Sequence, residues 1–114
     1  MKRIPAIFYR TEAGNEPVRD WLRSMSADDR RRVGEDLKII EFGWPLGLPI
    51  CRSLGAGLHE LRSDLGSNRT VRLFFYVDRL RSLVVLHGIV KKTRPAADLA
   101  LARSNKRKHE RSLG

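Results

Sequence analysis

The fold of this chain is decided by the stretch from Gly57 to Val90, which reads GLHELRSDLGSNRTVRLFFYVDRLRSLVVLHGIV. Three runs in it are rich in residues that favour strands, and they cover 57–64, 69–78 and 83–90. Only short turns separate these runs, so we expect them to form an antiparallel meander. The third run is apolar on both faces, which predicts that it lies in the centre of the sheet.

Alternation along the first two runs divides their side chains between two faces of the sheet. The face expected to meet the core carries Leu61, Val71, Leu73, Phe75 and Val77. The opposite, outward face carries Glu60, Arg62, Arg72, Phe74 and Tyr76. We therefore expect two arginines and two aromatic rings to be accessible on the same side of the sheet.

Two helices are expected before the meander. Asn15 is a suitable N-cap for the first and Ser26 for the second. Apolar residues recur at helical spacing at Val18, Trp21, Leu22 and Met25, and again at Val33, Leu37 and Ile40. The connection between them is very short, so the two helices are expected to form an antiparallel hairpin.

A short strand at 6–10 precedes the hairpin, and a helix that opens at Pro95 follows the meander. The element order is therefore β-α-α-β-β-β-α. The predicted fold class is α+β, with two layers in which an antiparallel sheet is packed by the N-terminal helical hairpin. Residues 1–114 form a single domain, and residues 105–114 are expected to be a frayed basic tail.

The charge of the chain is strongly positive and unevenly distributed. Lys and Arg number 23 against 13 Asp and Glu, which gives a formal net charge of +10. Nine of these ten surplus charges lie after Cys51. Such a concentration predicts that the second half of the chain meets a polyanion, and a solvated basic surface is the alternative.

The positions of the basic residues favour RNA as the polyanion. Arg62 and Arg72 lie on adjacent predicted strands, and Lys91 and Lys92 follow the end of the third. Guanidinium groups bind phosphate bidentately, and aromatic rings stack on unpaired bases. We assign further RNA contacts to Arg69, Phe74, Tyr76 and Arg94. The alternative is that these arginines are solvated or paired with a carboxylate such as Glu60.

The sequence offers little support for other chemistry. It has no complete glycine-rich nucleotide loop and no histidine spacing typical of a metal site, so no metal and no cofactor are expected. His59 is expected at the border of the core, and His109 in solvent. His87 is expected to be buried and hydrogen-bonded, with an active-site role as the alternative. Cys51 is interpreted as a small, inert apolar residue.

The compartment follows from two absences in the sequence. It shows no apolar segment that could span a bilayer and none near Met1 that resembles a signal peptide. Its single cysteine cannot form an intramolecular disulfide. We therefore expect a cytoplasmic protein with no membrane partner.

Three stretches together resemble a known family. They are LGAGLHELR at Leu54–Arg62, RLFFY at Arg72–Tyr76 and LHGIVKKT at Leu86–Thr93. In this order and spacing they resemble the phage-derived HigB-like toxins of the RelE/ParE superfamily. The resemblance extends from the first strand to the alanine-rich last helix, and it implies the RelE-like form of the predicted fold.

The resemblance also implies a function. It implies the toxin of a type II toxin–antitoxin system, a ribosome-dependent mRNA endonuclease neutralised by an antitoxin with a helix-turn-helix domain. Arg62, Arg72, Lys91 and Lys92 correspond by position to the basic residues that the family uses around the scissile phosphate, and they are our predicted catalytic residues. The predicted reaction is metal-free attack of a ribose 2′-OH on the adjacent phosphate, with the general base left open.

Two other functions stay open at this point. A ParE-like toxin would inhibit DNA gyrase by protein contact and would not need the basic cluster. A catalytically inactive RNA-binding domain would bind RNA with an affinity that falls with salt, and would release no product.

Overall fold

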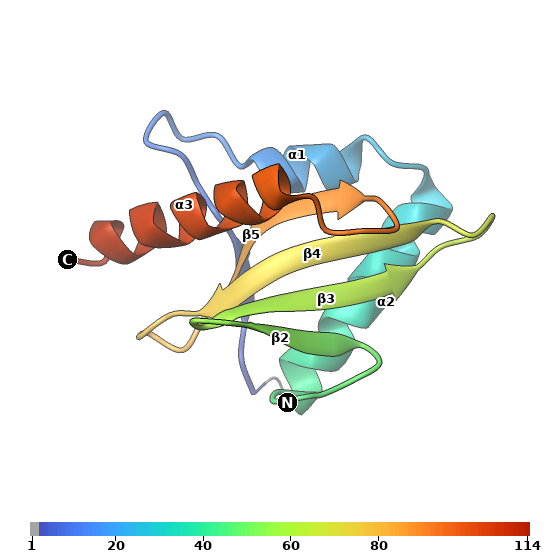
Figure 1. Cartoon of the computed structure of the whole chain (residues 1–114), viewed down its shortest axis with the longest axis horizontal. Coiled ribbons are helices and arrows are strands. Elements are labelled where there is room, and N and C mark those ends of the chain that lie inside the picture. The colour runs from blue at the N-terminus through green and yellow to red at the C-terminus, as the bar shows by residue number, and fades with distance from the viewer. Residues whose placement is uncertain (1–2) are drawn as a thin grey trace.

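The structure is a computed structural model that describes residues 3–114. Five strands form one sheet in the order β1-β5-β4-β3-β2 (Figure 1). The strands are β1 (Ala6–Phe8), β2 (Cys51–Gly55), β3 (Leu58–Asp64), β4 (Thr70–Val77) and β5 (Leu83–Val90). The helices are α1 (Pro17–Arg23), α2 (Ala27–Gly43) and α3 (Ala96–Ser112).

The predicted meander is confirmed, because β3, β4 and β5 are consecutive antiparallel neighbours. The prediction of a purely antiparallel sheet is wrong, since β1 pairs with β5 in parallel. β2 was not predicted from the sequence. It pairs with β3, but its Arg52 and Ser53 are exposed, so it lacks the apolar alternation that would reveal a strand.

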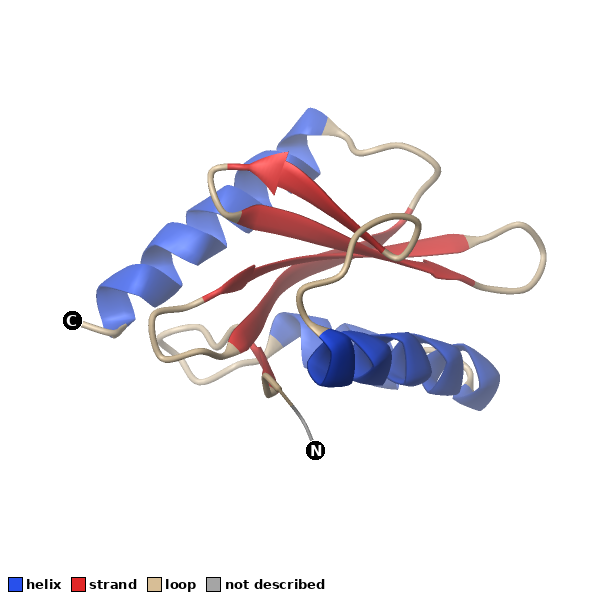
Figure 2. Cartoon of the chain, turned by 90° about the horizontal axis from the view of Figure 1, so that it is seen from below, coloured by secondary structure: helices blue, strands red, loops and turns tan. Residues whose placement is uncertain are grey.

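The helices cover both faces of the sheet. Figure 2 shows α1 and α2 on one side of the strands and α3 on the other. The predicted two-layer arrangement is therefore wrong, and the chain has three layers. The reason lies in β4, where the adjacent residues Phe74 and Phe75 point to opposite faces and both are fully buried. Both faces of that strand are apolar, so each needs a cover.

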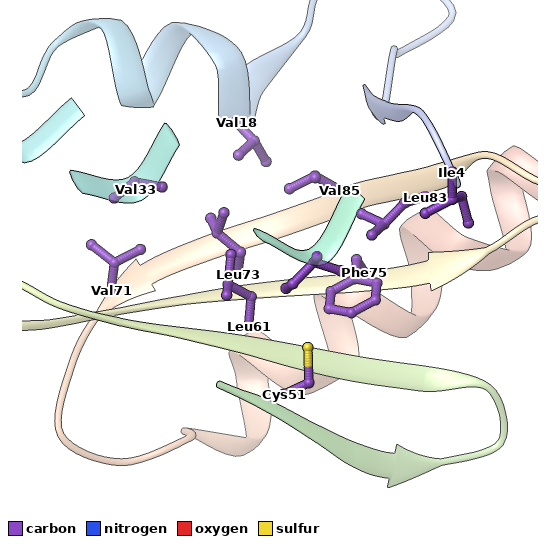
Figure 3. Packing of buried hydrophobic residues seen from close by; sticks show 11 residues of the cluster. Ile4, Val18, Val33, Cys51, Leu61, Val71, Leu73, Phe75, Leu83 and Val85 are labelled. Atoms are coloured by element: carbon purple, nitrogen blue, oxygen red, sulfur yellow. The ribbon is translucent and has the colours of Figure 1, made fainter. Parts of the chain in front are cut away.

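The core under α1 and α2 matches the expected pattern (Figure 3). All five residues assigned to the inward face of the meander pack in it, together with the predicted apolar residues of the two helices. Gly88 of β5 lets α1 approach closely. A Cβ built on Gly88 would lie 2.5 Å from Cζ3 of Trp21 and 2.8 Å from Cδ2 of Leu73. The predicted cap of α2 is also confirmed, since the Ser26 Oγ accepts a hydrogen bond from the Asp29 amide at 3.2 Å.

The prediction of a frayed tail at residues 105–114 is wrong, because α3 continues as a helix to Ser112. Three contacts hold this part of the helix on the sheet. Asn105 donates from Nδ2 to the Leu86 carbonyl at 3.0 Å, and Tyr76 and His109 share a hydrogen bond of 2.5 Å. The Arg79 guanidinium contacts the Leu113 carbonyl beyond the helix. These contacts come from residues distant in sequence, which is why the basic composition of the tail did not reveal them.

Candidate functional site

A buried carboxylate stands at the centre of the basic cluster. Glu60 of β3 is only 2% exposed, and Nη1 of Arg72 donates to its Oε1 at 2.6 Å. Arg94, in the segment after β5, contacts both carboxylate oxygens of Glu60 and donates from Nη2 to Oε1 at 3.2 Å. Two guanidinium groups therefore compensate one buried carboxylate, as the burial of a charged side chain requires.

Arg72 also fastens the segment that joins β5 to α3. Its Nε donates to the Lys91 carbonyl at 3.1 Å, and its Nη2 donates to the Lys92 carbonyl at 2.7 Å. Arg72 is 6% exposed, so its guanidinium is directed into the protein and away from any external phosphate. The structure confirms that Arg72 lies beside Lys91 and Lys92, and it gives the arginine the geometry of a positioning residue.

A histidine–carboxylate pair lies next to this segment. His87 Nε2 is 2.8 Å from Oδ1 of Asp98, and Lys91 Nζ is 2.8 Å from Oδ2 of the same carboxylate. The hydrogen bond from Lys91, followed by that from His87, lowers the pKa of the Asp98 carboxyl. Asp98 stands in the first turn of α3, where the helix dipole also favours a negative charge.

The His87 ring is fixed but accessible. Its side chain is 20% exposed, and it stacks on the buried ring of Phe74 with centroids 6.2 Å apart. The expected hydrogen bond is confirmed, whereas the expected full burial is not. A partly exposed imidazole with an ionised carboxylate on one nitrogen has the arrangement of a general acid or base.

Exposed cations adjoin Arg72, and one of them, Lys91, also binds the Asp98 carboxylate. Arg62 lies directly opposite Arg72 in the β3–β4 register, and its side chain is 52% exposed and forms an ion pair with Asp64 at 3.4 Å. Lys91 has a side chain that is 50% exposed, and Lys92 is exposed as well. We name Arg62, His87, Lys91, Lys92 and Asp98 the cationic site.

Three predicted RNA-contact residues do not join the cationic site. Arg69 sits at the β3–β4 turn, where its guanidinium binds the Asp29 carboxylate of α2 at 2.8 and 3.1 Å. The prediction that Phe74 and Tyr76 are accessible is wrong, because α3 covers that face of the sheet and leaves them 0% and 4% exposed. Burial raises the pKa of the Tyr76 hydroxyl to about 12. Neither ring can stack on a base in this structure.

For Arg72 the alternative given by the sequence, pairing with Glu60, is confirmed. Sequence reasoning missed the Arg94–Glu60 contact and the pairing of His87 with Asp98. Each contact joins residues on different elements, and Asp98 lies eleven positions after His87. No motif spacing encodes such a pair. The only available signal was a polar histidine within the apolar strand β5, which was recognised as a possible active-site residue.

The remaining reactive side chains are structural. His59 packs between Trp44 and Phe75, and burial lowers the pKa of its imidazole, as expected for the border of the core. Burial raises the pKa of the Cys51 thiol to about 11, which agrees with an inert residue. His109 is not solvated as expected, since it binds Tyr76. Within residues 3–114, no three His, Cys, Asp or Glu side chains are grouped to hold a metal ion.

Comparison with known proteins gives the family. The family model described as Phage derived protein Gp49-like (DUF891) matches residues 20–108, so the chain belongs to this toxin-like family. The match includes α2, the whole meander and the cationic site. A search of curated proteins finds no match. None of the helices in the described part of the chain is both long and apolar enough to cross a membrane.

Proposed function

We propose that this protein is the toxin of a type II toxin–antitoxin pair and acts as a ribosome-dependent mRNA endonuclease. Membership of a toxin-like family supports the first part of this proposal. The observation that carries the second part is the His87–Asp98 pair, with 2.8 Å between Nε2 and Oδ1, set among exposed cations. A site that only binds RNA has no need of an oriented imidazole.

His87 is proposed as the general base. In the proposed tautomer Nε2 carries the proton and donates it to the Asp98 carboxylate in a hydrogen bond, which leaves Nδ1 as the acceptor. Nδ1 takes the proton of the ribose 2′-OH, and the 2′-oxygen forms a bond to the adjacent phosphorus. The bond from phosphorus to the 5′-oxygen breaks, which leaves a 2′,3′-cyclic phosphate and a 5′-hydroxyl.

The cations complete the reaction. Arg62 and Lys91 stabilise the charge that develops on the phosphorane oxygens. Lys91 is held by Asp98, so the exposed Lys92 is the better donor of a proton to the departing 5′-oxygen. Arg72 acts indirectly, because it donates hydrogen bonds to the backbone carbonyls of Lys91 and Lys92. Glu60 in turn holds the Arg72 guanidinium in place. The ribosome would position the message, an effect worth about 7–11 kcal/mol in favourable cases.

The proposal includes the partners and the compartment. The toxin acts in the cytoplasm, where ribosomes and mRNA are found. The cognate antitoxin, with its helix-turn-helix domain, would neutralise the toxin by covering the cationic site with acidic or apolar surface. An antitoxin bound there would block access of mRNA to the site, and its acidic groups would complement the excess positive charge.

The test compares His87→Gln and Asp98→Asn with the wild type by growth arrest and by mapping mRNA cuts in cells. Asp28→Asn is a matched control, because Asp28 also stands in the first turn of a helix and forms an ion pair, with Arg31. We expect His87→Gln to lose about 100-fold or more of its cleavage rate, as for removal of a general base. Asp98→Asn should also be strongly impaired, and Asp28→Asn should retain full toxicity.

Thermal melts establish that each variant is folded. If folded His87→Gln cuts mRNA like the wild type, the catalytic assignment is wrong. If the wild type arrests growth through DNA damage and leaves mRNA intact, the protein acts like a ParE-type gyrase inhibitor.

A further inference from the structure

A large cavity opens where the edge of β5 loses its partner. β1 pairs only with Leu83–Val85, so the edge of β5 beyond Val85 has no neighbouring strand among the described residues. A cavity of about 1120 Å³ occupies this position. Its floor is the segment Leu86–Gly88, and its walls come from the β1–α1 loop, α1 and the part of α3 from Leu101 to Ser112.

The walls combine an apolar interior with a cationic rim. Trp21 of α1 and Leu101 of α3 line the cavity, and Leu101 is 45% exposed although it is a large apolar residue. Arg10, Lys108 and Arg111 supply positive charge, against Glu12 as the acidic residue in the lining. The apolar interior suits the flat ring of a nucleobase, and the cationic rim suits the phosphate attached to the same nucleotide.

His87 belongs to both the cavity and the cationic site. It lines the cavity floor, and its Nε2 binds Asp98. A nucleotide in the cavity would therefore adjoin the phosphate held at the cationic site. We propose that this cavity binds one nucleotide of single-stranded RNA next to the cleaved bond. The proposal rests on the function proposed above and names the part of the protein that would contact the base.

An acidic peptide could also match the cationic rim. The floor residue His87 favours RNA, because the Nδ1 acceptor of the proposed mechanism suits a ribose hydroxyl and cannot bond the acceptor-only carboxylates of an acidic peptide. The proposal also gives a function to the basic C-terminal end of α3. Hydrogen bonds of Asn105 and His109 hold this end on the sheet although it carries a high positive charge. The peptide alternative becomes one of the outcomes of the test.

The test measures binding of a labelled hexauridine RNA to His87→Gln protein, which should not cleave it. The double variant Lys108→Ala/Arg111→Ala removes two cations that line the cavity. The control Lys38→Ala/Arg107→Ala removes two exposed cations outside it. We expect the cavity variant to bind about tenfold more weakly at low salt, and the slope of log affinity against log salt to fall by about 1.4. The control variant should bind RNA with the affinity of the His87→Gln parent, and its slope of log affinity against log salt should fall by less than that of the cavity variant.

A second measurement is independent of affinity. Ultraviolet cross-linking of 4-thiouridine RNA, followed by mass spectrometry, should label Trp21 or the peptide 101–112. Labelling confined to Arg62 and Lys92 would overturn the proposal, as would equal binding by the two double variants. Weaker binding of an acidic peptide with unchanged RNA binding would also overturn it, in favour of a protein-docking groove.

The two proposals fail in different ways. If His87→Gln abolishes cleavage while the cavity variant binds and cleaves normally, the endonuclease stands and the cavity proposal is wrong. If the wild type does not cleave RNA but the cavity variant loses RNA binding and the cross-link, the cavity is a nucleotide site and the endonuclease assignment is wrong.

Discussion

The two faces of the sheet use the same strands in different ways. The face under α1 and α2 is filled mainly by aliphatic and aromatic side chains, with Phe75 and Leu73 fully buried. Its buried carboxylates, Asp36 and Glu41 of α2, accept hydrogen bonds from Ser63 and from the Ala6 amide. The face under α3 has a second apolar cluster around Phe74, and next to it the buried charges Glu60 and Arg72. One face is devoted to stability, whereas the other combines packing with the positioning of charge.

This difference shows how a small domain can build a site without losing its core. α3 contacts the sheet through the small Ala102 and the polar Asn105, both of which are buried. Its first turn supplies Asp98 to His87, and its last turns line the cavity. The helix that closes the second face therefore also forms one side of the proposed site. The predictions that follow test this division between the faces.

The largest effect is expected from the adjacent pair Phe74→Ala and Phe75→Ala. Each ring is fully buried, on opposite faces, so each substitution should lower the free energy of unfolding by about 3–5 kcal/mol. Urea denaturation measures both. A loss for Phe74→Ala below 1 kcal/mol, with the full loss for Phe75→Ala, would mean that α3 does not cover its face in solution.

Removal of the central carboxylate should also be costly. Glu60→Ala leaves Arg72 buried without its partner and should lower the free energy of unfolding by about 3 kcal/mol. The double variant Glu60→Leu/Arg72→Met removes both buried charges, so it should be more stable than Glu60→Ala. Its cleavage activity should nevertheless be lost, because the Lys91–Lys92 segment has lost its anchor. Full activity in the folded double variant would contradict the positioning role of Arg72.

A smaller, pH-dependent effect is expected at the ion pair of Asp98. The pKa of the Asp98 carboxyl is lowered in the folded protein. The ion pair therefore stabilises the fold fully at pH values above the unfolded-state pKa of about 3.9. This contribution is lost as the pH falls through the pKa of the folded state. The stability difference between the wild type and Asp98→Asn should shrink as the pH falls from about 5 to below about 4. Urea denaturation across this range measures it. A difference that does not shrink over this acidic range would show that Asp98 is not ion-paired in solution.

The smallest effect on stability is expected at Arg62. Its ion pair with Asp64 is exposed, with side chains 52% and 66% accessible, so Arg62→Ala should change the free energy of unfolding by less than about 0.5 kcal/mol. Its cleavage activity should fall, because the arginine is proposed to bind the phosphate. Wild-type cleavage by this variant would remove Arg62 from the cationic site.

Local patterns predicted much of the fold. β4 and β5 were recognised from their strand-forming residues, and the inward residues of the meander and both helical stripes were placed in the correct core. The layer under α3 was misplaced, because alternation separates two faces without showing which of them a distant helix will cover. The parallel pairing of β1 and the polar strand β2 also depend on partners far away in sequence.

The candidate site divides in the same way. The cations were recognised by residue type, and the register places Arg62 opposite Arg72 as their adjacent strands suggested. The sequence could not show that Arg72 points inward, because this depends on its contacts with Glu60 and with the Lys91 and Lys92 carbonyls. Nor could it show that Asp98 binds His87, because this depends on where α3 begins relative to the end of β5. Tertiary contacts, rather than residue type, decide whether an arginine can bind a phosphate or instead positions another residue that binds it.

The central claim is most directly tested by the chemistry of the RNA ends. Purified protein is incubated with ribosomes programmed with a defined message, and the termini of the fragments are identified for the wild type and for His87→Gln. The wild type should produce 2′,3′-cyclic phosphate and 5′-hydroxyl ends, and His87→Gln should leave the message intact. Fragments with 5′-phosphate ends, or equal cleavage by the folded variant, would contradict the proposed mechanism.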